Sequence, residues 1–240
     1  MRAFILSMIM IGGSLLSVWG QTSDYGLKKP VSELEIQLIQ GMFQRILETD
    51  QQCRKYAASN TLDDRILAQL DSAGEAGGLE GYIQFQESLH LELPKSVEDS
   101  LWKVQHQLDL QNHLALRGIF ETYGYLPEEI TGELDYLQLL VLMHPPCEWD
   151  VRTYLESYAE LFRDEVKAGR MPAKTFASFY DNQLGKILRE PQLYGTNEVY
   201  SRETGKIGPP VIADLAQSNA ARAEIGLPPL TEGEYQLAEE

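Results

Sequence analysis

Residues 96–124 read SVEDSLWKVQHQLDLQNHLALRGIFETYG, and this stretch decides the fold class. Its apolar residues recur at the intervals of one helical face, at Leu101, Val104, Leu108, Leu116, Ile119, Phe120 and Tyr123. Ser96 and Asp99 suit a helix start, and Gly124 suits the position just past a helix end. The stretch therefore predicts a long amphipathic helix over about 98–123.

Similar patterns lie on both sides of this helix. Ser32 and Glu35 have the spacing of a capping box and open a predicted helix over 32–58. Further helices are expected at 133–144, 150–168 and 172–188, the first ended by Pro145 and Pro146. Short connections between helices favour antiparallel neighbours. We therefore expect a mainly α fold, an antiparallel multi-helix bundle, with a short helical-hairpin solenoid as the alternative architecture.

Two regions are less regular. Glycines at 74, 77, 78 and 81 follow a short predicted helix at 63–70, and residues 82–92 fit a strand and a short helix equally well. Residues 191–210 are rich in loop-forming residues, with a small β-ribbon expected around 197–207 and a helix at 211–225. The expected organisation is one helical domain over 32–230 followed by an acidic tail at 231–240.

The N-terminus resembles a secretory signal peptide. Arg2 precedes an apolar run from Ala3 to Leu16, and the small residues Val18 and Gly20 suit cleavage before Gln21. A membrane-spanning helix needs about 20 apolar residues, and this run is shorter. We expect residues 1–20 to be removed and 21–31 to form a flexible leader, an uncleaved anchor being the alternative. The mature chain is then exported, either periplasmic or secreted.

The composition excludes some partners. The formal net charge of −16 repels nucleic-acid phosphates and anionic lipid, so no nucleic-acid binding and no stable membrane insertion after cleavage are expected. The two cysteines, Cys53 and Cys147, lie in no metal-binding spacing. An oxidising compartment would allow a Cys53–Cys147 disulfide, and two buried free thiols are the alternative.

Three side chains are candidate catalytic residues. His144 ends a predicted helix, where the helix dipole favours a cationic imidazolium, so it could act as a general acid or base or simply cap the last carbonyls. Asp181 lies inside a predicted helix, where it is either exposed or faces a partner such as His144. Asp50 shares a helical face with Arg54, which allows a simple ion pair or a site in which Arg54 anchors an anion.

The candidate binding residues lie mainly on the C-terminal loop. Gln192, Tyr194, Thr196 and Asn197 offer hydrogen-bonding groups to a sugar or a peptide, although a purely structural turn explains them equally well. His90, His106 and His113 are interpreted as surface or partly buried residues. No HxxxH, HxxE or paired-carboxylate spacing supports a metal site, and no cofactor is expected.

The same loop carries a resemblance. Residues 192–197 (QLYGTN) and 222–230 (RAEIGLPPL) resemble the tail of a bacterial family catalogued as domain of unknown function 6624, which has the pattern Q-x-Y-G-T-Q followed by R-x-x-x-G-L-P-P-L. Upstream, residues 50–54 (DQQCR) are similar to its D-Q-x-x-R, and Asp109 with Asn112 to its D-x-x-N. Further positions match in order, namely Gly124 and Pro127, His144, and Asp181.

The resemblance covers about residues 43–230, with 60–97 poorly matched. This chain departs from the family pattern at Met143, Pro145, Asn182 and Asn197. Because the family has no assigned activity, the resemblance implies a fold unit and a set of residues without naming a reaction.

Two functional hypotheses follow. The first is a noncatalytic exported module that binds an envelope polymer, a peptide or a partner protein through the 191–210 loop. The second is a small hydrolase or transferase in which His144 exchanges protons, Asp181 or Asp50 orients it, and the remaining candidates, Arg54 and the loop residues, hold the substrate. Convergence of these side chains in one cleft would favour catalysis.

Overall fold

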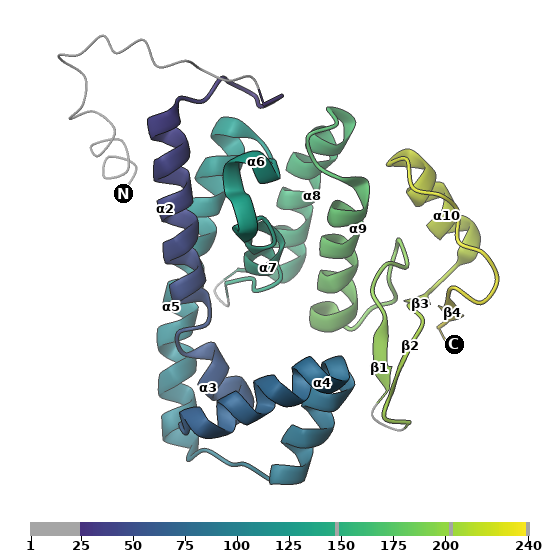
Figure 1. The fold of residues 1–240 in the computed structure, drawn as a ribbon. Helices are drawn as coiled ribbons and strands as arrows, with labels where there is room; N and C mark the ends of the chain where they lie inside the picture. The colour runs from purple at the N-terminus through teal and green to yellow at the C-terminus, as the bar shows by residue number, and fades with distance from the viewer. Residues whose placement is uncertain (1–24, 147–148, 202–203, 239–240) are drawn as a thin grey trace, which may run out of the picture.

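The computed structural model describes residues 25–146, 149–201 and 204–238, and it is mainly helical (Figure 1). The helices are α2 (Glu33–Asp50), α3 (Arg54–Ser59), α4 (Asp64–Leu89), α5 (Lys95–Tyr123), α6 (Glu128–Thr131), α7 (Leu137–Leu142), α8 (Val151–Lys167), α9 (Ala173–Asn182) and α10 (Leu215–Glu224). A 3-10 turn, η2 (Gly132–Leu134), follows α6, and a π-helical turn, η3 (Gln183–Leu188), continues α9. The mainly α fold predicted from the sequence is confirmed. The predicted signal peptide lies outside the described residues.

The bundle is built around α2 and α5, which run antiparallel side by side, with α7, α8 and α9 packed beyond them (Figure 1). Aromatic side chains fill its centre, and those with no more than 1% exposure are Phe43, Phe120, Tyr158, Phe162, Phe176 and Phe179. The Phe120 and Phe162 rings meet edge to face with centroids 5.1 Å apart. Burial of each large apolar side chain contributes about 1.5–3 kcal/mol, so these stripes provide the main stabilisation of the bundle.

The helix ends follow sequence signals. Ser32 and Glu35 form the predicted capping box at the start of α2, each side chain accepting the other's backbone N–H. Gly124 follows α5 at φ +86° and lies against the buried carboxylate of Glu165, where any Cβ would stand 2.4 Å from Oε2. Glu165 also binds Arg170 and Lys28 at 2.7 and 3.1 Å. The close approach explains why only glycine fits after α5.

Residues 25–31 are held to the bundle, which differs from the flexible leader predicted at 21–31. The backbone N–H of Lys28 donates to the Tyr123 carbonyl at 3.0 Å, and its ammonium group binds the Phe120 carbonyl and Glu165. Val31 is fully buried. The sequence could not reveal this contact, because Lys28 is fixed by groups about a hundred residues away.

The glycine-rich segment forms a bent helix. Residues 64–89 stay helical apart from Gly78, whose φ of 62° and ψ of −155° mark a sharp kink. The second arm folds back on the first, since a Cβ on Gly81 would lie 2.6 Å from the carbonyl oxygen of Ala73. The glycines therefore bend α4 and allow its two arms to touch. This resolves the undecided segment 82–92 as helix.

The C-terminal segment packs beside α9. β1 (Val199–Ser201) and β2 (Lys206–Gly208) form the predicted antiparallel ribbon, with Tyr200 opposite Ile207. β3 (Val211–Ile212) pairs in parallel with β4 (Gln236–Leu237). The acidic tail predicted at 231–240 is thus partly strand, and the helix predicted at 211–225 starts only at Leu215.

The helix predicted at 133–144 is shorter in the structure. Asp135 accepts hydrogen bonds from Thr131 and Gln138, while the Gln138 amide binds both backbone groups of Leu126. These side-chain bonds favour turns over a continuous helix, so α7 begins only at Leu137.

Candidate functional site

Asp50 and His144 form a pair between the ends of α2 and α7. Asp50 is the last residue of α2 and is 1% exposed. The Nδ1 atom of His144 lies 3.0 Å from its Oδ1, and Gln51 donates to the other carboxylate oxygen at 2.6 Å. The His144 side chain is 21% exposed, and its Nε2 has no hydrogen-bond partner among the described residues. The pair leaves one imidazole nitrogen free for a proton or a ligand.

The electrostatics of Asp50 favour its charged form. Burial alone would raise the pKa of the carboxyl group, but the hydrogen bond and charge of His144 and the charge of Arg54 outweigh burial, so the pKa is lowered. When Nδ1 of His144 carries the proton, it donates to this carboxylate, and Nε2 is then the basic nitrogen. The pair has the orienting geometry of a general-base dyad.

Arg54 does not form the predicted ion pair with Asp50. The chain turns at residues 51–53, so Asp50 and Arg54 lie on different helices, and Arg54 Nη2 binds Asp109 Oδ1 at 2.7 Å. Gln105 joins these groups, since its Oε1 accepts the backbone N–H of Cys53 and of Arg54 and its Nε2 donates to Asp109. This network holds the turn between α2 and α3 against α5.

His113 rather than His144 caps the end of α7. The structure corrects its interpretation as a surface or partly buried residue, because His113 is 0% exposed and its Nε2 donates to the His144 carbonyl at 2.8 Å. Burial lowers the pKa of His113 to about 4 despite the nearby carbonyls. The Leu142 carbonyl is bound by Tyr154 and Gln183. Pro145 and Pro146 lack amide protons, so side chains satisfy this buried helix end.

Asp181 is buried in a second network, away from His144. Its carboxylate accepts the backbone N–H groups of Leu193, Tyr194 and Thr196 at 2.9 Å and the Thr196 hydroxyl at 2.8 Å. Burial, opposed by these hydrogen bonds, raises the pKa of Asp181. Asp181 is therefore occupied in fixing the C-terminal loop to α9, and no hydrogen bond joins it to His144.

The predicted loop residues bond mainly to one another. Gln192 Oε1 accepts the backbone N–H of Thr196 and Asn197, and the Asn197 side chain exchanges hydrogen bonds with Ser178 on α9. Tyr194 is buried, and its carbonyl accepts from Arg222 Nη1 at 2.6 Å. The two segments that carry the family resemblance, 192–197 and 222–230, thus contact each other. Their contacts account for these residues as parts of the fold.

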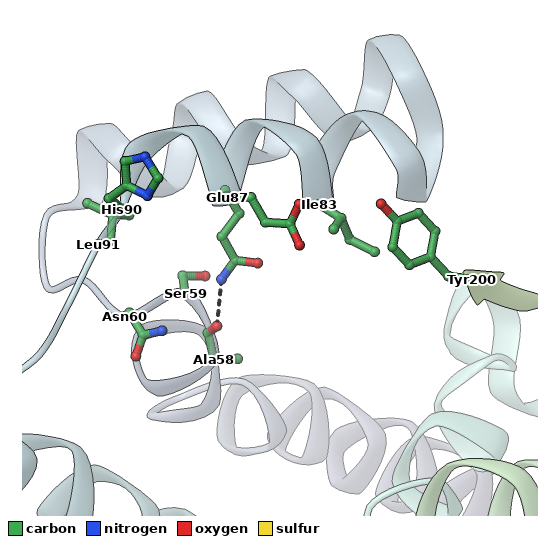
Figure 2. A pocket seen from close by; sticks show the side chains of 9 residues that line it. Ala58, Ser59, Asn60, Ile83, Glu87, His90, Leu91 and Tyr200 are labelled. Carbon is green, nitrogen blue, oxygen red and sulfur yellow. Dashed lines mark hydrogen bonds between the residues drawn. The ribbon is translucent and has the colours of Figure 1, made fainter. Parts of the chain in front are cut away.

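A cavity of about 460 Å³ lies between the end of α3, the second arm of α4 and β1. Its lining residues are Ala58, Ser59, Asn60, Ile83, Gln86, Glu87, His90, Leu91 and Tyr200. Glu87 and Ile83 extend from α4, and Tyr200 closes the side formed by the ribbon (Figure 2). Gln86 is fixed by a hydrogen bond to the Ala58 carbonyl at 2.8 Å, the dashed line in Figure 2. We call this cavity the α4 pocket.

The contact of β2 with α4 shapes this pocket. Glu80 accepts the backbone N–H of Ile207 at 2.7 Å, and Ser59 and Tyr82 join α3 to α4 through their hydroxyl groups at 3.0 Å. Sequence reasoning missed the pocket, since most of its lining lies at 58–91, where the fold was undecided. The available signals were the glycine cluster, which indicates close approach, and the expected ribbon that contains Tyr200.

Cys53 lines a second cavity, of about 550 Å³, which lies beside the end of α2, α3 and the first part of α5. Its side chain is buried, and burial raises the pKa of the thiol. Cys147 lies outside the described residues, so the disulfide stays a prediction. Within the described ranges, no group of three or more His, Cys, Asp or Glu side chains could hold a metal ion. In the same ranges, no helix is long and apolar enough to cross a membrane.

Comparisons with known proteins found no similar protein. No family model, no curated protein and no solved structure matches the chain. The resemblance to domain of unknown function 6624 therefore stays a prediction, and the functional argument depends on the chain's own geometry.

Proposed function

We propose that this chain is an exported, noncatalytic binding module that takes a polar ligand into the α4 pocket. The observation that carries the proposal is the pocket itself, whose volume is in the usual range of about 300–1,000 Å³ for ligand sites. It combines apolar walls at Ile83 and Leu91 with hydrogen-bonding groups. The carboxylate of Glu87, the His90 ring and the Tyr200 hydroxyl have no hydrogen-bond partner among the described residues.

The separation of the candidate catalytic residues supports a noncatalytic role. The predicted catalytic residues converge only in part, since Asp50 lies beside His144 whereas Asp181 is bonded to the C-terminal loop. Neither cavity described above is lined by any of the three. The predicted loop takes part in binding through its middle, where β1 contributes Tyr200 to the α4 pocket.

A screen of soluble envelope oligosaccharides and peptides, followed by thermal unfolding, tests the proposal. A ligand of the pocket should raise the unfolding temperature of the wild-type protein, and Tyr200→Ala should abolish that rise. Tyr136→Ala, which truncates an exposed tyrosine that does not line the pocket, is the matched control and should respond as the wild type does. A ligand whose effect survives Tyr200→Ala binds elsewhere and contradicts this assignment.

Export is tested separately. Expression of the full chain with its N-terminus intact should give a mature protein outside the cytoplasm whose first residue is Gln21. Retention of residues 1–20 in the purified protein would contradict this part of the proposal.

A second candidate function is a hydrolase or transferase that uses His144 as general base, and the Asp50–His144 pair is the observation that favours it. In a substrate screen for turnover, such an enzyme would lose most of its rate in His144→Ala and in Asp50→Asn, because positioned acid–base groups contribute about 10²–10⁴-fold. Activity that is unchanged in both variants would rule out this pair.

A further inference from the structure

We propose that the α4 pocket recognises a lysine or arginine side chain of a peptide, with Glu87 as its ion-pair partner. This inference rests on the proposed binding function and specifies its ligand.

The first argument is the charge around the pocket. Residues 66–94, which include most of α4, contain Asp71, Glu75, Glu80, Glu87 and Glu92 but no lysine or arginine. The whole chain has a net charge of −16. Such a field attracts a cation and repels an anionic ligand at distances up to a Debye length, about 8 Å at physiological salt.

The second argument is that Glu87 has no cationic partner. Some acidic side chains of this chain are ion-paired, as Asp109 is with Arg54 and Glu165 with Arg170. The Glu87 carboxylate forms no ion pair and no hydrogen bond within the described residues, and it lines the pocket. Glu80 lies about two helical turns before Glu87 on α4. Its carboxylate already accepts a hydrogen bond from the backbone N–H of Ile207.

The third argument is the chemistry of the remaining walls. Ile83 and Leu91 provide an apolar surface for the methylene groups of a lysine or arginine side chain. The Tyr200 ring can accept a cation over its face, and the free Oε1 of Gln86 can accept a hydrogen bond. The cavity of about 460 Å³ is larger than one side chain, which leaves room for part of the peptide backbone.

The test compares three short capped peptides that differ only at the central residue, which is arginine, glutamine or glutamate. Binding to the purified mature protein is followed by ¹H–¹⁵N NMR spectra. The arginine peptide should shift the amide resonances of residues such as Ile83 and Tyr200. The glutamine peptide should bind more weakly, and the glutamate peptide should cause no shift.

Two matched variants separate a local ion pair from the general field. Glu87→Gln and Glu75→Gln each remove one negative charge from α4, but Glu75 is exposed and outside the pocket lining. Glu87→Gln should lower the affinity for the arginine peptide about fivefold, which is the upper range for an exposed ion pair. Glu75→Gln should change its affinity by less than about twofold. Dispersed spectra of both variants establish that they fold.

The outcomes distinguish this inference from the proposed function. Equal weakening by both variants, or equal binding of the arginine and glutamine peptides, overturns the ion-pair inference while shifts at the pocket still support binding there. If an oligosaccharide shifts the pocket resonances and no peptide does, the ligand class is wrong. If no probe of either class shifts them, the binding function fails as well.

Discussion

At the scale of single residues, the notable feature is a set of ionisable side chains buried where helices end. His113 and Asp50 lie within one continuous network around α7, yet their surroundings affect protonation in opposite directions. Burial keeps His113 neutral, whereas hydrogen bonds and neighbouring positive charge keep Asp50 ionised. The two groups should therefore control stability in different ranges of pH.

His113 should make the protein less stable as the pH falls from about 6.5 to about 4. Its pKa is lowered from 6.5 to about 4 on folding, so the unfolded chain binds the proton more readily in this window. Stability is fully present above the unfolded pKa and falls by roughly 3 kcal/mol toward the folded pKa. Urea unfolding at a series of pH values should show this slope, and His113→Asn should flatten it. An unchanged slope in the variant would mean that another group is responsible.

Asp50 should act at lower pH. Its folded pKa lies below the ordinary value of 3.8, so its contribution is present above that value and is lost as the pH falls through the folded pKa. Asp50→Asn should remove this part of the acid dependence and leave the slope between pH 4 and 6.5 intact. Each variant is thus the control for the other. A loss of the upper slope in Asp50→Asn would show that the two groups titrate as a unit.

At the scale of elements, α4 has a specific requirement for glycine at two positions. Its second arm approaches Ala73 so closely that Gly81 has no space for a side chain, and Gly78 needs a backbone conformation that other residues rarely adopt. Gly77, by contrast, has nothing within 4 Å of the position of a Cβ. Gly81 and Gly77 therefore differ in whether they tolerate a side chain, although both are glycines within α4.

Gly81→Ala should destabilise the protein by about 1–3 kcal/mol, since the new methyl group meets a backbone carbonyl at 2.6 Å and the arms of α4 must separate. Gly77→Ala should be neutral or stabilise by up to about 1 kcal/mol through helix propensity. Chemical denaturation of both variants measures the difference. Equal effects of the two substitutions would contradict the bent geometry of α4.

An element could be predicted from the sequence when the interactions that form it lie within the element itself. The helices around Ile39, Leu116 and Phe162 could be predicted, because their apolar spacing and end signals lie within the helix itself. The bend of α4 could only be suspected, since glycine spacing does not show which backbone comes close. The turns before α7 depend on Gln138 binding Leu126, a contact that leaves no periodic pattern.

At the scale of the whole molecule, the candidate site residues separated into groups that the sequence could not distinguish. Asp50, Arg54 and His144 lie in one network of hydrogen bonds. Asp181 and Gln192 belong to another, which fastens the C-terminal segment to α9. Both networks use buried polar side chains, so residue type alone cannot separate a site from a structural contact. Only the arrangement of their partners does so.

Asp181→Ala should release the C-terminal segment while the bundle stays folded. The substitution leaves the N–H groups of Leu193 and Tyr194 and the Thr196 hydroxyl without their acceptor, and the Thr196 N–H keeps only Gln192, at a cost of about 3 kcal/mol or more. Hydrogen exchange followed by mass spectrometry should show faster exchange at 192–230 and little change in α2 and α5. Thr196→Val, which removes one of the four hydrogen bonds, is the milder control. Uniformly faster exchange would instead mean that the segment and the bundle unfold together.

The hydrogen bond from Ile207 to Glu80 joins residues 127 positions apart. Closing so long a loop carries a large entropic cost, and such contacts usually form after local structure. The α4 pocket needs this contact to bring β1 beside α4, so it is completed only when nearly the entire chain has emerged and folded. A ligand of the pocket would then bind the fully folded protein and would not bind incomplete chains, so ligand binding would measure the completion of folding.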